Sequence, residues 1–506
     1  MKKSILLFIF PFMLSLLCLE GQTIHRLSLD ECVELAAEQN FQMRKSKSAY
    51  DIAKYQYLIQ LSRLKTNIGF SVDPSFSKWY NPQTDISDSN GNNLHTSNRN
   101  FSTSTYLRVH QPLATGGYID FSPGFILERT DYYATNLDNQ SIISQSNKTL
   151  SFRPSLNLVQ PLSTFYAYNS YKHFQENTEL SFEKSELSYR QAKFLNQYQI
   201  GNIYIELQHI LQGIAVQKKL LSTKKMAYNK ASEKNAENSS ELLKLKIEIE
   251  RTETALNDLF HDYAGKANNL KEQLALPARD SIIVTGNTDI KEYILNMDEL
   301  VDIATERHLQ LKKYNIDIKL DEISYKETKS QSLPRADLSV NFNPGAAVSG
   351  SADLSYLDLM SDAWDRSKRK TETLNDLTIG LSISLPVYEA KRIKNARIIA
   401  EEKIRLDKIN VEEQEQLIQS NIYTLVAQIE YTLENLKILE GTKTSTQQNI
   451  EDDIQKFYNN KADSYHLAYD FMLWEEARLN YNTAIMNYNL LLNRLEYEIL
   501  DHMENL

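Results

Sequence analysis

The sequence predicts a mixed α+β membrane protein in which one unit, made of a helix, a strand pair and a long helical hairpin, occurs twice. Three observations lead to this fold class. Landmarks of the first half recur in the same order in the second half, several segments alternate apolar and polar residues, and long runs carry apolar residues at heptad spacing. Only 14 glycines and 11 prolines occur among 506 residues, which favours long uninterrupted elements.

The charge balance and the motif content exclude several classes of function. The chain has 66 Asp and Glu against 56 Lys and Arg, so no excess of cations is available to neutralise nucleic-acid phosphates. The 9 histidines are scattered without zinc-site spacing, and no GxGxxG, GxxxxGK[ST] or GxSxG pattern occurs. We therefore expect no enzyme, no catalytic residue, no metal, no cofactor and no nucleic-acid partner.

The N-terminus has the pattern of a signal peptide over residues 1–21. Lys2 and Lys3 precede an apolar run from Ile5 to Leu19, which is too short to span a bilayer comfortably. Cleavage after residue 21 would leave Cys32 as the single cysteine, so no intramolecular disulfide is expected. No other run approaches the length of a transmembrane helix, so membrane insertion would require strands closed into a β-barrel.

The remaining chain is interpreted as an internal duplication. Residues 29–36 (LDECVELA) align with 297–304 (MDELVDIA) at an offset of 268, and Pro161 aligns with Pro386 at an offset of 225. The first repeat is predicted over 22–286 and the second over 287–506. The difference between the two offsets is 43 residues of extra material in the first half.

Period-two alternation locates the strands. Leu377, Ile379 and Leu381 alternate with small or polar residues, as lipid on one side and a wet lumen on the other would require. A soluble sandwich is the commoner source of this pattern, but too few strands are predicted to build one. Strands are predicted at 335–344 and 376–386 in the second repeat, and around 68–72 and 152–158 in the first.

The extra material of the first half contains a further strand pair at about 100–131. Its two strands flank the turn at 115–117. Pro123 interrupts the second of them, which suits a sheet edge, a bulge or a hairpin outside a barrel. The sequence leaves the place of this pair open.

Heptad spacing predicts the helices. Ile418, Ile422 and Leu425 show the spacing of a coiled-coil seam. An unbroken arm of about 70 residues would be about 105 Å long, and such a rod must pack on sister helices, which suggests an oligomer. A solvent-exposed structural coiled coil is the alternative interpretation. The predicted segments are a helix at 297–332 and helical hairpins at 162–276 and 388–503.

These features together resemble the TolC-like outer-membrane efflux proteins. Residues 27–40 (LSLDECVELAAEQN) are similar to the start of that family, 474–481 (WEEARLNY) to its last helix, and Pro161 and Pro386 to its strand ends. The resemblance spans the chain after the signal peptide. It implies a homotrimer in the cell outer membrane with a long periplasmic extension. Each chain would give four strands to a shared 12-stranded β-barrel, which an α-helical coiled-coil barrel continues.

The resemblance also implies site residues at the hairpin tips. In the family a small-residue turn is followed six residues later by an acid, and Asn235 with Glu241 fits this pattern with Asn in place of Gly. Asn460 is followed at that position by a histidine, so Asp463 and Asp470 are the substitutes for a periplasmic gate. Asn235, Glu241 and Asn460 are expected to contact an adaptor protein.

Two further groups of residues carry expectations. An acidic run at 451–453 lies near a predicted tip, either as part of the gate or as a solvated loop. Aromatic residues that follow the strands are expected to form two interfacial girdles. These are Trp79, Tyr80 and Trp364 on one side, and Phe165, Tyr166, Tyr168 and Tyr388 on the other.

The resulting hypothesis is the outer-membrane exit duct of a tripartite efflux system. Its partners would be a periplasmic adaptor (membrane fusion) protein, an inner-membrane pump and outer-membrane lipid. The duct of a one-step protein secretion system would look the same, so the sequence does not decide between drugs, metals and proteins as cargo. A periplasmic or surface coiled-coil scaffold that forms no channel is an alternative of a different class.

Overall fold

The computed structural model describes residues 23–87, 93–136, 142–233, 240–286, 290, 292–351, 353–372, 376–385, 390–459 and 464–500. They form two compact units. A helical unit comprises the residues up to Ile52, Lys184–Asn315 and those from Ile409 onwards, and a sheet unit comprises Ala53–Glu183 and Ile316–Lys408. Among the described residues, no helix combines the length and the apolar character that crossing a membrane requires.

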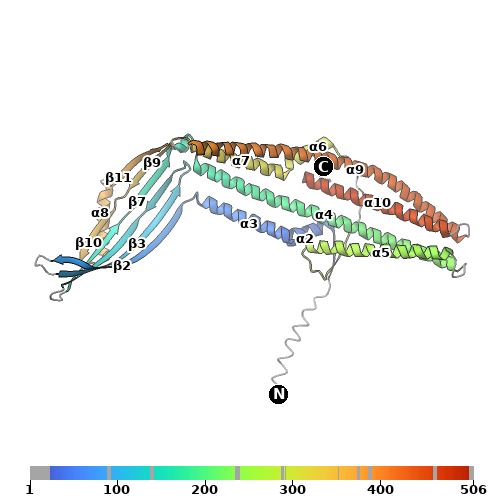
Figure 1. The fold of residues 1–506 in the computed structure, drawn as a ribbon, viewed down its shortest axis with the longest axis horizontal. Helices are drawn as coiled ribbons and strands as arrows, with labels where there is room; N and C mark the ends of the chain where they lie inside the picture. The colour runs from blue at the N-terminus through green and yellow to red at the C-terminus, as the bar shows by residue number, and fades with distance from the viewer. Residues whose placement is uncertain are drawn as a thin grey trace, which may run out of the picture. The chain divides into compact units, whose positions relative to one another are not determined.

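Long helices dominate the structure, and four of them contribute residues to both units (Figure 1). Two short strands, β1 (Ile24–Leu27) and β8 (Ser281–Val284), pair in parallel in the helical unit. The helices are α2 (Leu29–Gln39), α3 (Phe41–Ser62), α4 (Ser170–Ser232), α5 (Ser240–Gln273), α6 (Met297–Arg307), α7 (Leu309–Ser330), α8 (Tyr356–Glu372), α9 (Ala390–Tyr458) and α10 (Ser464–Ile499), with a 3₁₀ turn η1 (Leu162–Phe165).

The helix pair α2–α3 recurs as α6–α7 with the same lengths. Each pair has helices of 11 and 22 residues, and each helix of the second pair begins 268 residues after its counterpart. The helix predicted over 297–332 is therefore two helices. His308 at the break has a ψ of 117° and Asn40 at the first break has 130°, both outside the helical region. Apolar periodicity passes through the break, so the pattern alone did not reveal it.

Corresponding side chains of the two pairs are buried. Cys32 and Ala36 of α2 pack against α4, α5 and β8, and Leu300 and Ala304 of α6 pack against α9 and α10. Burial raises the pKa of the Cys32 thiol to about 12, so the reactive thiolate is strongly disfavoured at neutral pH. Cys32 is therefore a packing residue.

Each long hairpin joins a long and a shorter helix. The first hairpin pairs α4 with α5, at 63 and 34 residues, and the second pairs α9 with α10, at 69 and 36 residues. Next to the tips, side chains of all four helices share one apolar core. Its members include Leu220, Leu245, Ile450 and Leu467, all of them at most 4% exposed. The two hairpins are therefore packed on each other within the helical unit.

The sheet unit contains nine antiparallel strands. Their order is β10-β6-β5-β3-β4-β7-β9-β11, and β2 pairs with the other edge of β3. The strands are β2 (Asn67–Ser87), β3 (Asn93–Pro112), β4 (Tyr118–Ser122), β5 (Gly124–Asn136), β6 (Ile142–Phe152), β7 (Ser155–Pro161), β9 (Arg335–Phe342), β10 (Ala346–Ser351) and β11 (Leu377–Ser384).

The sheet is larger than the sequence predicted. The extra pair expected at about 100–131 is β3 paired with β4 and β5, and it lies between β2 and β7 in the sheet order. Pro123 interrupts it inside the sheet and not at an edge. Strand β10 and helix α8 were not predicted. Ser355, whose hydroxyl accepts from the Asp358 N–H at 3.2 Å, is the N-cap signal that would have located α8.

Candidate conduit wall and hairpin tips

One continuous register crosses six strands of the sheet and aligns an apolar row on one face next to a polar row on the other. Paired residues of an antiparallel sheet point to the same face, and the next residue of each strand points to the other. The row on one face is Leu377, Phe342, Leu156, Phe121, Val109 and Ile68, all apolar. The adjacent row on the other face is Thr378, Asn341, Asn157, Asp120, His110 and Asn67, all polar.

The apolar face is exposed over most of its extent. Ile379, Ile383 and Phe70 keep 67%, 69% and 72% of their surface exposed. An apolar band of this size is unusual on the surface of a soluble monomer and indicates contact with lipid or another protein. On the opposite face, polar pairs such as the Ser75 and Ser102 hydroxyls, 2.7 Å apart, form a surface that water can wet.

The aromatic residues expected at the strand ends have different positions. Trp79 lies in β2 and is 57% exposed, and Phe165 and Tyr166 follow β7 and are also exposed. The Tyr166 hydroxyl donates to the Pro334 carbonyl at 2.6 Å. Trp364, however, lies in α8 and not after a strand, which corrects that expectation. Tyr388 and the side chain of Tyr80 lie outside the described part of the chain.

Most of the predicted tip residues lie outside the described residues. This holds for Asn235, Asn460 and Asp463, and Glu241 is described only as part of the first turn of α5. Of the two strand-end prolines, Pro386 also lies outside the described residues. Pro161 is described as the last residue of β7. Its carbonyl accepts a hydrogen bond from the Thr164 hydroxyl at 2.6 Å, which closes the turn between the strand and α4.

Asp470 is described, and it pairs with a second carboxyl. It lies on α10 and shares a hydrogen bond with Asp453 of α9, which belongs to the acidic run noted in the sequence. Burial, together with the Asp453 hydrogen bond and charge, raises the pKa of Asp470 to about 6. The hydrogen bonds from Asp470 and from the Lys456 ammonium, 2.8 Å away, lower the pKa of Asp453.

The geometry of a hairpin explains this pairing. Asp453 precedes the tip by about as many residues as Asp470 follows it, so two antiparallel helices bring them to the same level. The sequence contains the same symmetry, but the predicted gate paired Asp470 with Asp463. At neutral pH the pair carries a charge between −1 and −2 and can exchange a proton.

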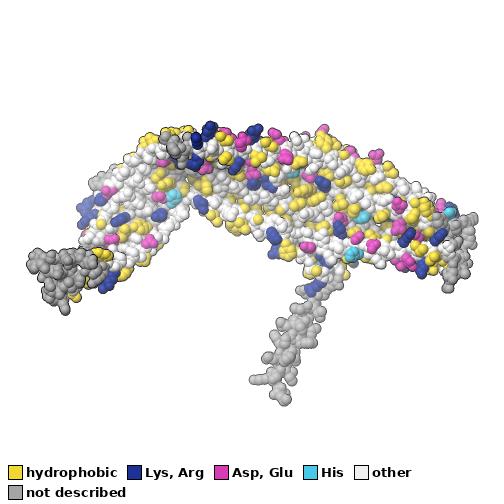
Figure 2. Space-filling view, viewed as in Figure 1, with side chains coloured by type: hydrophobic (Ala, Val, Ile, Leu, Met, Phe, Trp, Pro, Cys, Tyr) yellow, Lys and Arg dark blue, Asp and Glu magenta, His cyan; other side chains and the backbone are white. Residues whose placement is uncertain are grey.

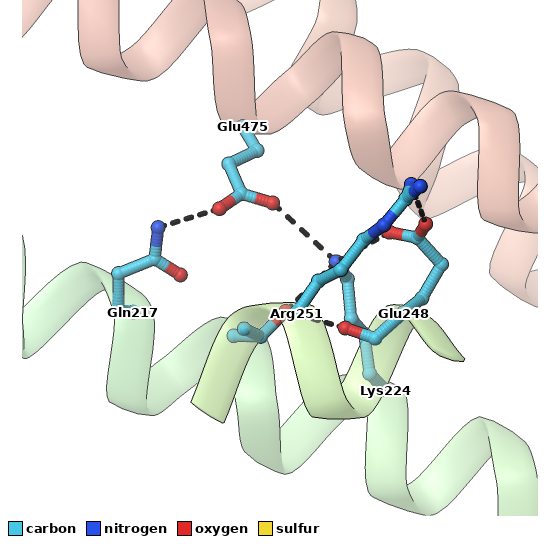
Figure 3. Close-up of polar contacts among 6 residues, drawn as sticks. Gln217, Lys224, Glu248, Arg251 and Glu475 are labelled. Carbon is cyan, nitrogen blue, oxygen red and sulfur yellow. Dashed lines mark hydrogen bonds and ion pairs between the residues drawn. The ribbon is translucent and has the colours of Figure 1, made fainter. Parts of the chain in front are cut away.

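A buried lysine links the two hairpins. Lys224 of α4 is completely buried, and its ammonium lies 3.2 Å from Glu248 of α5 and 3.4 Å from Glu475 of α10. It also donates to the Thr252 hydroxyl at 3.0 Å. Figure 3 shows Lys224 pointing between the two carboxylates, each of which has a second donor. These donors are Gln217 for Glu475, at 2.6 Å, and Arg251 for Glu248, at 2.8 Å.

The network is balanced in charge, with two cations and two carboxylates. Sequence reasoning missed it because two adjacent lysines, Lys224 and Lys225, resemble part of a solvated helix face. On the visible surface of the helices, acidic and basic side chains are interspersed with hydrophobic ones (Figure 2). Within the described ranges no group of three or more His, Cys, Asp or Glu side chains could hold a metal ion.

The chain is similar to known proteins in its fold but not in its sequence. No family model and no curated protein matches the chain. The Neisseria gonorrhoeae MtrE outer-membrane channel, in its open state, is 10% identical with a TM-score of 0.62, over 94% of this chain and 89% of that one. The Campylobacter jejuni CmeC outer-membrane channel is 13% identical with a TM-score of 0.60, over 93% and 85%.

The outer-membrane protein VceC of Vibrio cholerae is 12% identical with a TM-score of 0.58, over 93% of this chain and 95% of that chain. Between 85% and 95% of the length of each of these proteins is thus matched. Identities this low concern the fold alone, and at that level the resemblance inferred from the sequence is confirmed: the chain has the TolC-like fold of these outer-membrane channels.

Proposed function

We propose that the protein is an outer-membrane exit duct of a tripartite efflux system, with its helices extending into the periplasm. The observation that carries this proposal is the six-strand register, in which a row of six apolar residues on one face alternates with a row of six polar residues on the other. Such a wall has its apolar side in lipid and its polar side on a water-filled lumen. The likeness to outer-membrane channels supports the same assignment.

The functional form is a homotrimer. Among the described strands, nothing pairs with the outer edge of β11 or of β2, and backbone groups in lipid need partners. Three copies joined edge to edge provide those partners. The inserted strands β3 and β4 raise the share of each chain from four strands to six, so the shared barrel would have about 18 strands, enough for an aqueous channel.

The helices support the same assembly. Leu406, Ile438 and Leu479 lie on long helices and are 57%, 63% and 58% exposed in a single chain. Sister helices in a trimer would cover them and form a periplasmic α-helical barrel. In this arrangement Asn235, Glu241 and Asn460 at the tips contact the adaptor protein that joins the duct to an inner-membrane pump.

The gate is assigned to the acids of the second hairpin. We place Asp463 and Asp470 in it, as the resemblance implies, and add Asp453 because of its hydrogen bond to Asp470. Three copies would form a ring that attracts cations and repels anions. Replacing Asp463 and Asp470 by Asn should weaken cation block in single-channel recordings, and unchanged selectivity would remove both residues from the gate.

The deciding experiment measures the native mass of the protein extracted in mild detergent from the outer-membrane fraction. We expect three protomers. Recovery of a monomer, or of protein in the soluble periplasm, would contradict the duct and favour a coiled-coil scaffold. A bulky substitution at Asn235 or Asn460 should then abolish export without loss of the trimer, and normal export would contradict the docking assignment.

A further inference from the structure

Three neighbouring strands of the sheet are interrupted by proline at the same level. Pro123 separates β4 from β5, Pro154 lies between β6 and β7, and Pro344 lies between β9 and β10. Proline has no backbone N–H, so the ladder has a line without donors, which we call the proline row. On one side of this row the backbone bonds between Gly124 and Arg153, at 2.8 and 3.2 Å, continue the pairing.

The apolar face continues across the proline row. Phe121, Leu156 and Phe342 are paired directly on the side towards the six-strand register. Phe152 pairs with Phe125 and with Ala346 on the other side, and these residues have the same parity along their strands. The two stretches of the sheet therefore present one continuous apolar face.

Helix α8 covers this face on one side of the proline row only. Leu359 and Ala363 are buried against Leu150, Phe152 and Val348. The Ser367 hydroxyl, also buried, donates to the Pro344 carbonyl at 2.6 Å and so anchors the helix on the row. In Figure 1, α8 lies beside β10, and hydrophobic contacts connect it to β6 as well.

An open cavity of about 480 Å³ lies between α8 and the proline row. This volume is typical of a site for a small ligand or a single acyl chain. The walls are almost entirely apolar. They consist of Phe121, Phe152, Ser155, Leu156, Phe342 and the three prolines of the row, with Trp364, Ser367, Lys368 and Thr371 on the α8 side.

The helix side of the cavity has two features of a membrane–water boundary. The Trp364 ring packs on Phe152, with centroids 5.3 Å apart, and yet is 56% exposed. Lys368 is exposed one turn further along the helix, next to the cavity. Tryptophan and lysine are the residue types that anchor proteins where acyl chains meet headgroups.

We propose that this cavity binds one acyl chain of an anionic membrane lipid, with the lipid phosphate at Lys368. The proposal rests on the proposed placement of the sheet in a membrane, because the cavity opens from the face that would contact lipid. A lipid fits better than a peptide, since a peptide backbone needs hydrogen-bond partners that these walls supply in small number. The ammonium of Lys368 complements the lipid phosphate in charge. The apolar face of the sheet provides a continuous surface along which the acyl chain can enter the cavity.

The test uses Trp364 as its own reporter. The chain has 3 tryptophans, so Trp79→Phe with Trp474→Phe leaves Trp364 alone. The purified full chain in detergent is titrated with phosphatidylglycerol brominated on its acyl chains, which quenches tryptophan on contact. Phosphatidylcholine with the same brominated chains is the second probe. We expect saturable quenching, with phosphatidylglycerol binding about tenfold more tightly, as one additional charge-assisted contact would give.

Two variants separate a defined site from general attraction to negative surfaces. Lys368→Gln removes the cation at the cavity, and Arg366→Gln removes an exposed cation of α8 that does not line it. We expect only Lys368→Gln to abolish the preference for phosphatidylglycerol. Thr371→Phe adds no tryptophan, fills part of the cavity and should reduce quenching by either lipid.

The outcomes also separate this proposal from the proposed function. A tryptophan placed at Ile379, with Trp364→Phe, reports lipid contact of the apolar band away from the cavity. Quenching at position 379 without quenching of Trp364 would overturn the lipid site and leave the membrane placement intact. Absence of quenching at both positions would contradict the membrane placement itself. Equal effects of Arg366→Gln and Lys368→Gln would also overturn the site, because they would indicate diffuse electrostatic binding.

Discussion

The Nδ1 atom of His110 on β3 lies 2.5 Å from Oδ1 of Asp120 on β4, on the polar face of the sheet. The adjacent residues Val109 and Phe121 are paired with each other on the opposite face. A step of one residue along either strand thus exchanges a polar environment for an apolar one. Because of this alternation, substitutions at adjacent positions can test which face of the sheet contacts lipid.

We expect lysine to have opposite consequences at two adjacent positions of β11. Ile379 and Thr378 are both exposed in the single chain, so both substitutions would cost little in a soluble protein. In a membrane, Ile379→Lys should destabilise the inserted sheet by about 2–4 kcal/mol, and Thr378→Lys should cost far less because it would face the proposed lumen. The measurement is denaturant unfolding in lipid vesicles, and equal costs would contradict the assignment of the faces.

The buried lysine predicts a large difference between neighbouring residues of α4. Lys224→Met leaves Glu248 and Glu475 without their shared cation and should destabilise the helical unit by about 3–5 kcal/mol. Lys225→Met is the matched control. Its ammonium lies 2.7 Å from Glu253 in an exposed pair, and its loss should cost less than about 1 kcal/mol. Helical circular dichroism during thermal unfolding distinguishes them, and similar melting temperatures would show that the network contributes little.

The Asp453–Asp470 pair predicts a pH dependence with a defined sign. The pKa of Asp470 is raised from 3.8 to about 6, so between these values the folded protein binds more protons than the unfolded chain. Its contribution to stability is therefore present at low pH and is lost as the pH rises through about 6. Asp453, with its lowered pKa, acts in the opposite direction and only in more acidic solution.

We expect Asp470→Asn to stabilise the second hairpin at pH 7 and to flatten the decline in melting temperature between about pH 4 and pH 7. Asp452→Asn, at an exposed position on the same helix, is the control and should leave that decline unchanged. A decline that persists in Asp470→Asn would assign the pH dependence to other groups.

The two helix breaks predict a stabilising substitution. The Asn40 side chain accepts from the backbone N–H groups of Gln42 and Met43, at 2.7 and 3.1 Å, and so caps α3. His308 occupies the corresponding break, and its Nδ1 is buried without a hydrogen-bond partner among the described residues. Burial and then the charge of Lys313 lower the pKa of His308, so the ring is neutral at pH 7.

We therefore expect His308→Asn to stabilise the helical unit by about 1 kcal/mol, because it supplies the missing cap of α7. Asn40→His is the reciprocal control and should destabilise by a similar amount. Denaturant unfolding measures both. A loss of stability in His308→Asn would mean that ring packing at this position outweighs the cap.

The sequence indicated those parts of the fold that depend on local periodicity. The alternation from Leu377 onwards located β11, and heptad spacing located the long hairpins, because both patterns reflect which face of an element is buried. It did not indicate the place of the extra strand pair, since strand order depends on contacts between distant segments. The break at His308 was missed because helical periodicity passes through it.

The candidate site was predictable to a smaller extent. Asp470 was predicted as a gate residue, which stays a prediction, and its hydrogen-bond partner Asp453 was identified only as one member of an acidic run. Lys224 gave no signal, because burial of a lysine depends on carboxylates supplied by two other helices. Trp364 was expected after a strand, and the helix that carries it was not predicted at all.

The proline row has a mechanical consequence for the sheet. Backbone hydrogen bonds hold neighbouring strands together. A sheet is therefore easiest to deform along a line of residues that have no backbone N–H. Stretching or twisting of the six-strand register would therefore be absorbed along Pro123, Pro154 and Pro344 before it reached the strands beneath α8. The six-strand register and the strands under α8 could then change curvature independently of each other. The Ser367 hydrogen bond to Pro344 would keep the two parts aligned.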